Sequence, residues 1–415
     1  MDDAWQLCGS YGENNYTYHN ASTYAPVVDM SLFPDFNIMT GYAHDLGLTA
    51  GWYGNNCICR DHCDTDECYQ ADVDALIGYG FDSVKLDGCG KQLDLDKWAS
   101  MFNASGNPIL IENCHWGNTI PTPTWCPWNT YRTSGDVRAS YESVINNLMS
   151  TVKFAKLGLS NPGCWSYPDM LEVGVSDGAA GDDDPGLTPD ETRTHFGAWC
   201  IVSSPLILSH DTTNKTVTDA IWDIISNKEA IAVNQAWYGE SGTIFSEYKK
   251  KIILYAPISQ KQQDNDPSMK MNTRWGISDY FIPLWGGDPK PTVEVSVGEW
   301  QQWSKMLNNY QTAILIINNS PNIHNITLTF QDIPSYKPIS PNTTMSIRDI
   351  WKHAELGFYK QFVAISLKSH ESSFLILSDL SHANKNIRNK KGFSSGLDES
   401  TVWRRSGQTG RNMLR

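Results

Sequence analysis

The order of strand-like and helix-like segments is the feature that most constrains the fold of this chain. Over about 235 residues, short apolar runs alternate with segments that have helical apolar spacing. After residue 242 the alternation stops, and strand-like runs separated by turn residues continue to residue 378. The first pattern predicts a barrel of parallel strands and helices, and the second predicts an antiparallel β domain.

The alternation predicts individual elements. Strands of the barrel are expected over residues 48–54, 81–88, 108–113, 128–136, 164–170 and 203–210. Helices are expected over 31–47, 67–80, 95–103, 139–156, 188–202 and 217–234. Strands of the β domain are expected over 252–255, 313–317, 326–330, 362–366 and 373–377. We therefore expect a barrel domain at residues 1–238 and an antiparallel β domain at 239–380.

The charge of the chain is unevenly distributed. The net charge is −14, yet residues 381–415 hold eight Lys/Arg and two Asp/Glu, so residues 1–380 carry −20. An acidic body disfavours nucleic acid and favours neutral ligands. Residues 381–415 are expected to be a basic, disordered tail, with an interaction arm as the alternative. No apolar run is long enough for a membrane span.

Cysteine usage points to an oxidising compartment. Six of the ten cysteines lie within Cys57–Cys114. Seven Asn-x-Ser/Thr sequons agree with this: Asn15, Asn20, Asn103, Asn214, Asn318, Asn325 and Asn342. No signal peptide follows Met1, so we expect the N-terminus to be incomplete. Cys57, Cys59, Cys63 and Cys68 lie around His62 and could be read as a zinc site, but they lack paired C-x2-C spacing, which favours disulfides.

Two aspartates stand at the ends of strand-like segments. Asp87 follows the apolar positions of 81–88, and Asp136 closes 128–136 in the same way. Taken alone, an Asp beside Gly is more often a turn residue or a helix cap. Two of them at the carboxyl ends of barrel strands indicate paired-carboxylate chemistry at the barrel mouth.

Several motifs together resemble a known family. They are KLDG (85–88), RTSGD (132–136), GCWSYPDMLEVG (163–174), NQAW (234–237), the leading Asp2-Asp3-x-Trp5 and IRDIW (347–351). In order and spacing they resemble the α-galactosidases of glycoside hydrolase family 27. The resemblance implies a (β/α)8 TIM-type barrel followed by an antiparallel β-sandwich. It also implies that the first strand and most of the second lie upstream of Met1.

The resemblance assigns a role to each matching residue. Asp87 is expected to be the nucleophile and Asp136 the acid/base of a retaining glycosidase. Lys85 and Arg132 are expected to share strand faces with these aspartates and to contact sugar hydroxyls. The other expected substrate-binding residues are Asp2, Asp3, Tyr53, His115, Trp116 and Asp169. For Lys85 and Arg132 the alternatives are a solvated strand end and a structural ion-pair partner.

The chain departs from the family pattern. Cys114-His115-Trp116 replaces Cys-Glu-Trp, whose Glu helps select the group at sugar C2, and Ala4 replaces a cysteine. The resemblance implies one disulfide from the cysteine-rich loop to Cys89 and another from Cys114 to Cys126. Cys164 and Cys200 are equally well read as free, buried thiols.

These inferences predict a retaining exo-glycosidase that hydrolyses terminal α-D-galactosyl bonds. The alternatives are α-N-acetylgalactosaminidase, β-L-arabinopyranosidase and a catalytically inactive galactose-binding protein. No metal or organic cofactor is expected, and the expected partner is a small carbohydrate, without nucleic acid or membrane. A homodimer is left open. Secretion, or delivery to a lysosome or vacuole, is the expected localisation.

Overall fold

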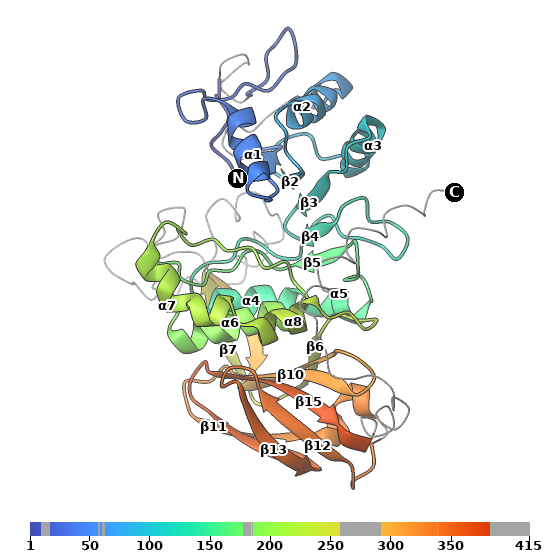
Figure 1. The fold of residues 1–415 in the computed structure, drawn as a ribbon, viewed down its shortest axis with the longest axis vertical. Coiled ribbons are helices and arrows are strands. Elements are labelled where there is room, and N and C mark those ends of the chain that lie inside the picture. Colours follow the sequence, from blue (N-terminus) through green and yellow to red (C-terminus); the bar gives the residue numbers. More distant parts are fainter. Residues whose placement is uncertain are drawn as a thin grey trace, which may run out of the picture.

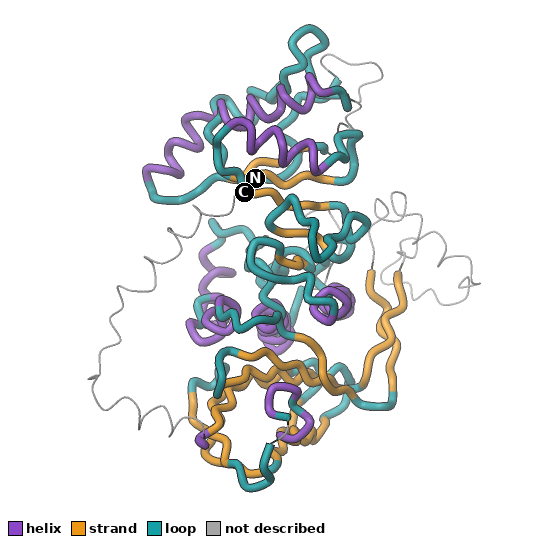
Figure 2. Tube along the Cα trace, turned by 90° about the vertical axis from the view of Figure 1, so that its right-hand side faces the viewer, coloured by secondary structure: helices purple, strands orange, loops and turns teal. Residues whose placement is uncertain are grey.

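The structure is a computed structural model, and it describes residues 1–9, 17–56, 59, 63–176, 184, 186–257, 292–337 and 339–381. Its elements are stacked along the long axis (Figure 1). The N-terminal helices and parallel strands occupy one end, further helices the middle, and antiparallel strands the other end. Figure 2 shows the same division from the side.

A parallel sheet of five strands organises the first part of the chain. Its strands are β1 (Gly51–Gly54), β2 (Ser83–Asp87), β3 (Leu110–Cys114), β4 (Thr130–Arg132) and β5 (Trp165–Tyr167). Each strand pairs with the next in the sequence, all in parallel. The five expected strands at these positions are confirmed, and the fold is that of a TIM-type barrel.

Residues 203–210 do not form the expected sixth strand. Leu208 makes a single parallel bridge with Leu171, which follows β5. Ser203 has a left-handed backbone with φ +60°, and Pro205 lacks a backbone N–H, so a continuous ladder cannot form here. The segment nevertheless lies beside the residues that follow β5, since the Leu171 N–H donates to the Ile207 carbonyl at 2.8 Å.

Helices occur near all the expected positions, with two of them divided. They are α1 (Phe36–Asp45), α2 (Asp66–Gly78), α3 (Leu95–Ser105), α4 (Tyr141–Ser150), α5 (Val152–Lys156), α6 (Pro189–Ile201), α7 (Lys215–Ile225) and α8 (Lys228–Gln235). The expected helix 139–156 is α4 plus α5, and 217–234 is α7 plus α8. The second break follows from Asn227, whose side chain accepts the N–H groups of Glu229 and Ala230 and so begins a new helix.

The C-terminal part is an antiparallel β-sandwich. A six-stranded sheet has the order β13 (Ala354–Lys360), β12 (Thr344–Asp349), β15 (Ser372–Asp379), β10 (Gln311–Asn318), β9 (Trp300–Met306), β6 (Thr243–Glu247). The pair β11 (His324–Thr329) and β14 (Phe362–Leu367) covers one face, and β7 (Lys251–Pro257) pairs with β8 (Thr292–Gly298). Short 3-10 turns lie at Phe330–Asp332 and Pro334–Tyr336. The five strands expected here are confirmed as β7, β10, β11, β14 and β15.

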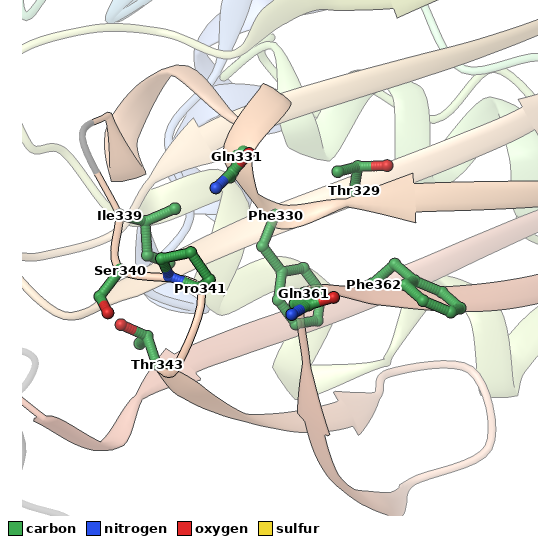
Figure 3. A pocket seen from close by; sticks show the side chains of 9 residues that line it. All are labelled: Thr329, Phe330, Gln331, Ile339, Ser340, Pro341, Thr343, Gln361 and Phe362. Atoms are coloured by element: carbon green, nitrogen blue, oxygen red, sulfur yellow. The ribbon is translucent and has the colours of Figure 1, made fainter.

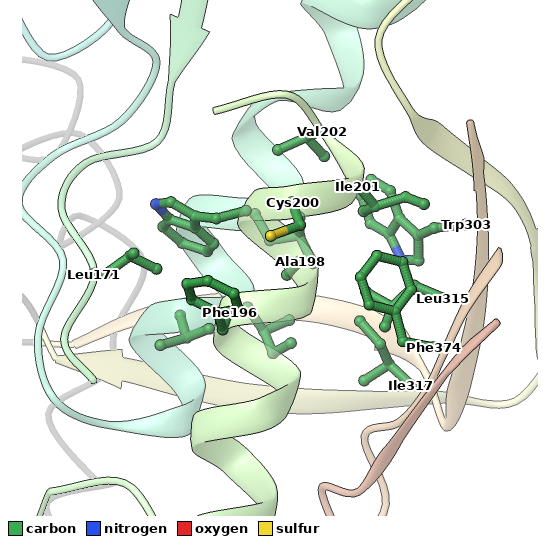
Figure 4. Packing of buried hydrophobic residues seen from close by; sticks show 14 of the residues in the cluster. Leu171, Phe196, Ala198, Cys200, Ile201, Val202, Trp303, Leu315, Ile317 and Phe374 are labelled. Atoms are coloured by element: carbon green, nitrogen blue, oxygen red, sulfur yellow. The ribbon is translucent and has the colours of Figure 1, made fainter. Parts of the chain in front are cut away.

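One apolar core joins the helices to this sheet. Ile201 of α6 lies on the side of Trp303, Leu315 and Phe374 of the sheet, whereas Phe196 lies on the side of Leu171 (Figure 4). A Cβ on Gly197 would lie 3.1 Å from Leu315 Cδ1, so glycine permits this close approach. We keep 1–238 and 239–380 as proposed domain limits, with a continuous core between them.

Disulfides connect the loops around the parallel sheet. Cys8 pairs with Cys59, Cys63 with Cys68, and Cys126 with Cys164. Disulfide bonding of the cysteine-rich loop is thus confirmed for Cys59, Cys63 and Cys68. Cys89 is also disulfide-bonded. Cys57 and His62 lie outside the described residues, so the expected bridge from the cysteine-rich loop to Cys89 stays a prediction.

The expected Cys114–Cys126 disulfide is wrong. Cys126 pairs with Cys164 instead, and Cys114 is a free, buried thiol, as is Cys200. The reason is topological: Cys114 ends β3 and faces Arg132, whereas Cys126 lies in the following loop beside the start of β5. Cys164, which could equally have been free, is therefore bonded.

Two expectations concern segments beyond these elements. Within the described ranges, every helix is too short or too polar to cross a bilayer. The expected tail lies outside the described residues from residue 382 onward.

Candidate active site

Asp87 lies at the carboxyl end of β2 and is almost fully buried. Its Oδ2 accepts a hydrogen bond from the Tyr53 hydroxyl at 2.6 Å, and its Oδ1 accepts the Gly88 N–H at 2.7 Å. Burial raises the pKa of Asp87 to about 6, with Asp136 adding to the rise, while Lys85 and the Tyr53 hydrogen bond oppose it. Asp87 is therefore held in place by two donors and senses the charge of Asp136.

Asp136 does not lie on a strand. β4 ends at Arg132, so the expectation that Arg132 and Asp136 share a strand face is wrong. The chain turns through Ser134 and Gly135, and this turn brings Asp136 Oδ1 to 3.0 Å from Arg132 Nη2. Asp136 is half exposed, whereas Arg132 is buried. An exposed carboxyl beside a buried aspartate is a suitable arrangement for exchanging protons with a leaving group.

Arg132 also holds Asp169. Its Nη2 lies 3.0 Å from Asp169 Oδ2, which in addition accepts the Val137 N–H at 2.8 Å. Asp169 has φ +86°, a strained backbone for a residue other than glycine, and Trp199 Nε1 donates to its carbonyl at 2.6 Å. Burial raises the pKa of Asp169 against the attraction of Arg132. One guanidinium thus positions both Asp136 and Asp169.

Lys85 lies on the same strand face as Asp87, two residues earlier. Its Nζ donates to Asp2 Oδ2 at 2.7 Å and lies 5.3 Å from the centre of the Tyr53 ring. Burial opposes the ammonium form, but neighbouring acidic groups, including Asp2 and Glu112, hold the pKa of Lys85 above its usual range. Lys85 therefore remains charged between Asp2 and Asp87.

The N-terminal loop is anchored beside β1. Trp5 Nε1 donates to the Tyr53 carbonyl at 2.9 Å, and the terminal ammonium of Met1 donates to the Gly51 carbonyl at 2.9 Å. The Asp3 carboxylate accepts the Ala4 N–H at 2.9 Å, and its charge helps to raise the pKa of Tyr53, for which burial is the largest cause. Asp2 and Asp3 thus lie next to the Tyr53–Asp87 pair.

His115 and Trp116 follow β3 directly. Trp116 has φ +48°, and its ring packs over Gly88, where a Cβ would lie 3.1 Å from Cζ3. His115 is buried, its Nδ1 lies 2.8 Å from Thr119 Oγ1, and burial lowers its pKa to about 4 despite the Asp87 carbonyl. Both rings therefore lie beside Gly88, where a Cβ would be 3.5 Å from His115 Cδ2, and the ring of His115 is also held by Thr119 of its own loop.

Glu112 belongs to this group of charges, although the motifs did not indicate it. It lies on β3, opposite Lys85 of β2. Burial raises the pKa of Glu112 to about 7, while Lys85 and Arg132 lower it. Alternation along a strand puts Glu112 and Cys114 on one face, so extending the expected strand 108–113 by one residue would have indicated this placement.

The assembled residues can do acid–base and nucleophilic chemistry on a polyhydroxylated ligand. Two cations lie among six carboxylates: Lys85 and Arg132 with Asp2, Asp3, Asp87, Glu112, Asp136 and Asp169. Carboxylates and cations that face one site supply the acceptors and donors that sugar hydroxyls require. Among the described residues no group of three or more His, Cys, Asp or Glu is arranged to hold a metal.

A separate cavity of about 310 Å³ lies in the β-sandwich. Figure 3 shows its lining: Thr329, Phe330, Gln331, Ile339, Ser340, Pro341, Thr343, Gln361 and Phe362. None of these side chains titrates near neutral pH, so the cavity offers no acid or base.

Comparisons with known proteins agree over most of the chain. The family model described as alpha galactosidase A matches residues 26–236, and that of the alpha galactosidase C-terminal beta sandwich domain matches residues 297–377. An α-galactosidase from Cyamopsis tetragonoloba is 25% identical over 390 residues, which cover 91% of this chain and 76% of that protein.

Solved structures show the same fold. The α-galactosidase I of Mortierella vinacea has a TM-score of 0.65 at 23% identity and covers 91% of this chain and 86% of its own. A β-L-arabinopyranosidase of Geobacillus stearothermophilus has a TM-score of 0.62 at 18% identity, with coverages of 91% and 87%. Both agree with a barrel followed by a β-sandwich.

Proposed function

Because the chain belongs to the α-galactosidase A family of glycoside hydrolases, we infer that it hydrolyses terminal α-D-galactosyl bonds. The observation that carries this inference is the Asp87 site itself. A buried carboxylate at the end of a parallel strand is held by Tyr53 and senses a second, half-exposed carboxylate, Asp136.

We propose that hydrolysis proceeds with retention in two displacements. Asp87 attacks the anomeric carbon while Asp136, as the acid, gives its proton to the leaving oxygen. Asp136 then acts as the base for the water that cleaves the galactosyl–Asp87 ester. Tyr53 supports this sequence, because its hydroxyl stabilises the ionised carboxylate and fixes the attacking atom.

The remaining candidates bind the sugar in this proposal. Asp2, Asp3, Lys85 and Asp169 supply hydrogen bonds to ring hydroxyls, and Tyr53 and Trp116 border the ring. Arg132 fixes Asp136 and Asp169 relative to each other. The role of His115 stays a prediction, because its ring is held by Thr119.

The decisive experiment combines turnover with product analysis. Wild type, Asp87→Asn and Asp136→Ala are assayed on an aryl α-D-galactoside, and the first-formed anomer is identified by proton NMR. We expect α-galactose from the wild type and almost no turnover by Asp87→Asn. Azide should restore Asp136→Ala and produce α-galactosyl azide, since azide attacks the galactosyl–enzyme on the face that water uses. β-Galactose as the first product would exclude the retaining mechanism.

A second sugar is favoured by one observation. The β-L-arabinopyranosidase of similar fold acts on a sugar that is galactose without its hydroxymethyl group. A panel of aryl α-galactoside, β-L-arabinopyranoside and α-N-acetylgalactosaminide separates the three activities by kcat/KM. Galactose binding without turnover of any of them would identify an inactive binding protein.

We propose that the protein acts in an oxidising compartment, outside the cell or in a lysosome or vacuole. The disulfides Cys8–Cys59 and Cys126–Cys164 support this. Of the sequons, Asn318 is fully buried and its amide donates to the Leu367 and Lys368 carbonyls, so it cannot carry a glycan in the folded state. A homodimer remains a proposal to be tested by light scattering.

A further inference from the structure

Glu112 is placed among the reactive groups by the register of the sheet. On β2, Lys85 and Asp87 share one face, and on β3, Glu112 and Cys114 lie opposite them in that order. Cys114 Sγ lies 3.4 Å from Arg132 Nη1, which confirms that this face of β3 looks toward the site. Glu112 therefore lies two residues, or about 7 Å along the strands, from the level of Asp87, toward their amino ends.

The Glu112 carboxylate differs from its neighbours in its partners. Asp87 is bonded to Tyr53, Asp2 to Lys85, and Asp136 and Asp169 to Arg132. No hydrogen bond joins the Glu112 carboxylate to any described residue, although Lys85 and Arg132 attract it. The Glu112 residue as a whole is half-buried. A carboxylate held by two nearby cations without a direct donor is ready to accept a hydrogen bond from a ligand.

His115, at the position where the family motif has a glutamate, carries no carboxylate. It is 5% exposed, its Nδ1 lies 2.8 Å from Thr119 Oγ1, and its buried Nε2 has no hydrogen-bond partner among the described residues. Burial is the largest cause of both pKa shifts, but the pKa of Glu112 also responds to the charges of Lys85 and Arg132, whereas that of His115 responds otherwise to the Asp87 backbone. The strand thus presents a carboxylate three residues before the position at which the motif has one.

We propose that Glu112 binds the galactosyl group by accepting a hydrogen bond from a ring hydroxyl remote from the anomeric carbon. The inference rests on the proposed function, which places the anomeric carbon at Asp87. A pyranose ring that extends from there toward Lys85 brings its C3 and C4 hydroxyls to the level of Glu112. Loss of this acceptor should weaken binding of the ground state and the transition state alike.

The test pairs protein variants with substrate analogues. Full-length wild type, Glu112→Ala, Glu112→Gln and His115→Ala are assayed on an aryl α-D-galactoside and on its 2-, 3- and 4-deoxy analogues. On the parent substrate we expect Glu112→Ala to lower kcat/KM by roughly 10- to 100-fold. On the analogue that lacks the partner hydroxyl, Glu112→Ala and wild type should differ by less than about threefold, because the interaction is already absent. His115→Ala should affect the four substrates by the same factor, because in this proposal its ring makes no contact that depends on one of these hydroxyls.

Three results would overturn the inference. They are an equal loss on all four substrates, no loss on any, or a substrate-selective loss in His115→Ala instead. Glu112→Gln keeps the shape of the side chain, and the exposed Glu67→Gln is the control for removal of a surface charge. Circular dichroism verifies that each variant is folded.

Calorimetric titration with galactose separates this inference from the proposed function. If wild type binds and hydrolyses galactosides while the Glu112 variants match it, only the inference fails. If wild type neither binds nor hydrolyses any galactoside, the proposed function fails and the inference fails with it.

Discussion

Two regions of the molecule bury side chains of opposite character. The first is the active-site end of the parallel sheet, and the second is the contact between α6 and the C-terminal sheet. At the first, Asp87, Arg132 and Asp169 are buried; Asp87 accepts a hydrogen bond from Tyr53, and Arg132 pairs with Asp169. At the second, Trp303, Leu315 and Phe374 are fully buried against α6 (Figure 4). Burial stabilises the second region, whereas in the first it raises the free energy of charged groups.

The difference indicates where stability and activity reside. The apolar contact can be weakened without touching a reacting group, and the charged site can be neutralised without opening a cavity. Activity and stability should therefore respond separately to substitutions in the two regions.

Replacement of the nucleophile should have the largest effect. Asp87→Asn removes the attacking carboxylate, so kcat/KM on an aryl α-galactoside should fall roughly 10⁴-fold or more. The midpoint of unfolding should not fall, because the neutral amide is buried more easily than the carboxylate. Steady-state kinetics and thermal unfolding measure the two quantities. The exposed Asp219→Asn serves as control. Near-normal activity in Asp87→Asn would remove the residue from the mechanism.

Truncation of the apolar contact should have the next largest effect. Trp303→Ala empties a fully buried site and should lower the free energy of unfolding by about 3–5 kcal/mol. At 25 °C the folded fraction should keep its kcat/KM. Trp222 on α7 is 59% exposed, and Trp222→Ala should stay within about 0.5 kcal/mol of the wild type. Denaturant titration measures both, and equal losses would contradict the assigned burial.

Removal of the hydroxyl that holds the nucleophile should have an intermediate effect. The Tyr53 hydroxyl donates to Asp87 and lowers its pKa, so Tyr53→Phe should raise that pKa above about 6. The acidic limb of the kcat/KM profile, which reports ionisation of Asp87, should then move to higher pH. At neutral pH, kcat/KM should fall roughly 10- to 100-fold. Tyr238→Phe, at an exposed site, is the control; an unmoved limb would mean that another group controls it.

The smallest effect should appear in the pH dependence of stability. Burial raises the pKa of Glu172 from 4.5 to about 7 against the Ser209 hydrogen bond. The native state then binds more protons than the unfolded state between these values, so stability falls as pH rises through this window. Glu172→Gln should reduce the fall by on the order of 2 kcal/mol. Urea titrations between pH 4.5 and 8 test this, with the exposed Glu294→Gln as control. If wild type and Glu172→Gln lost the same free energy of unfolding across this pH range, the prediction would be contradicted.

Much of the fold could be read from the sequence because local patterns agree with the final structure. The apolar positions of 81–88 and 108–113 became β2 and β3, and the Thr188-Pro189 start of α6 forms a capping box with Glu191. The segment 203–210 could not be read correctly, since an apolar run predicts a strand whether or not its backbone can continue the ladder. Its positive φ at Ser203 and the lack of a donor at Pro205 decide the outcome.

The sequence by itself determined the division into a barrel and a β-sandwich and the expected nucleophile and acid/base pair, because strand ends and short motifs are local. Only the tertiary structure decided that Arg132 bridges Asp136 and Asp169, that Cys126 bonds Cys164, and that Glu112 lies opposite Lys85. These contacts join different strands and loops. Their formation depends on the register of the sheet and on the direction of each turn, which no single segment contains.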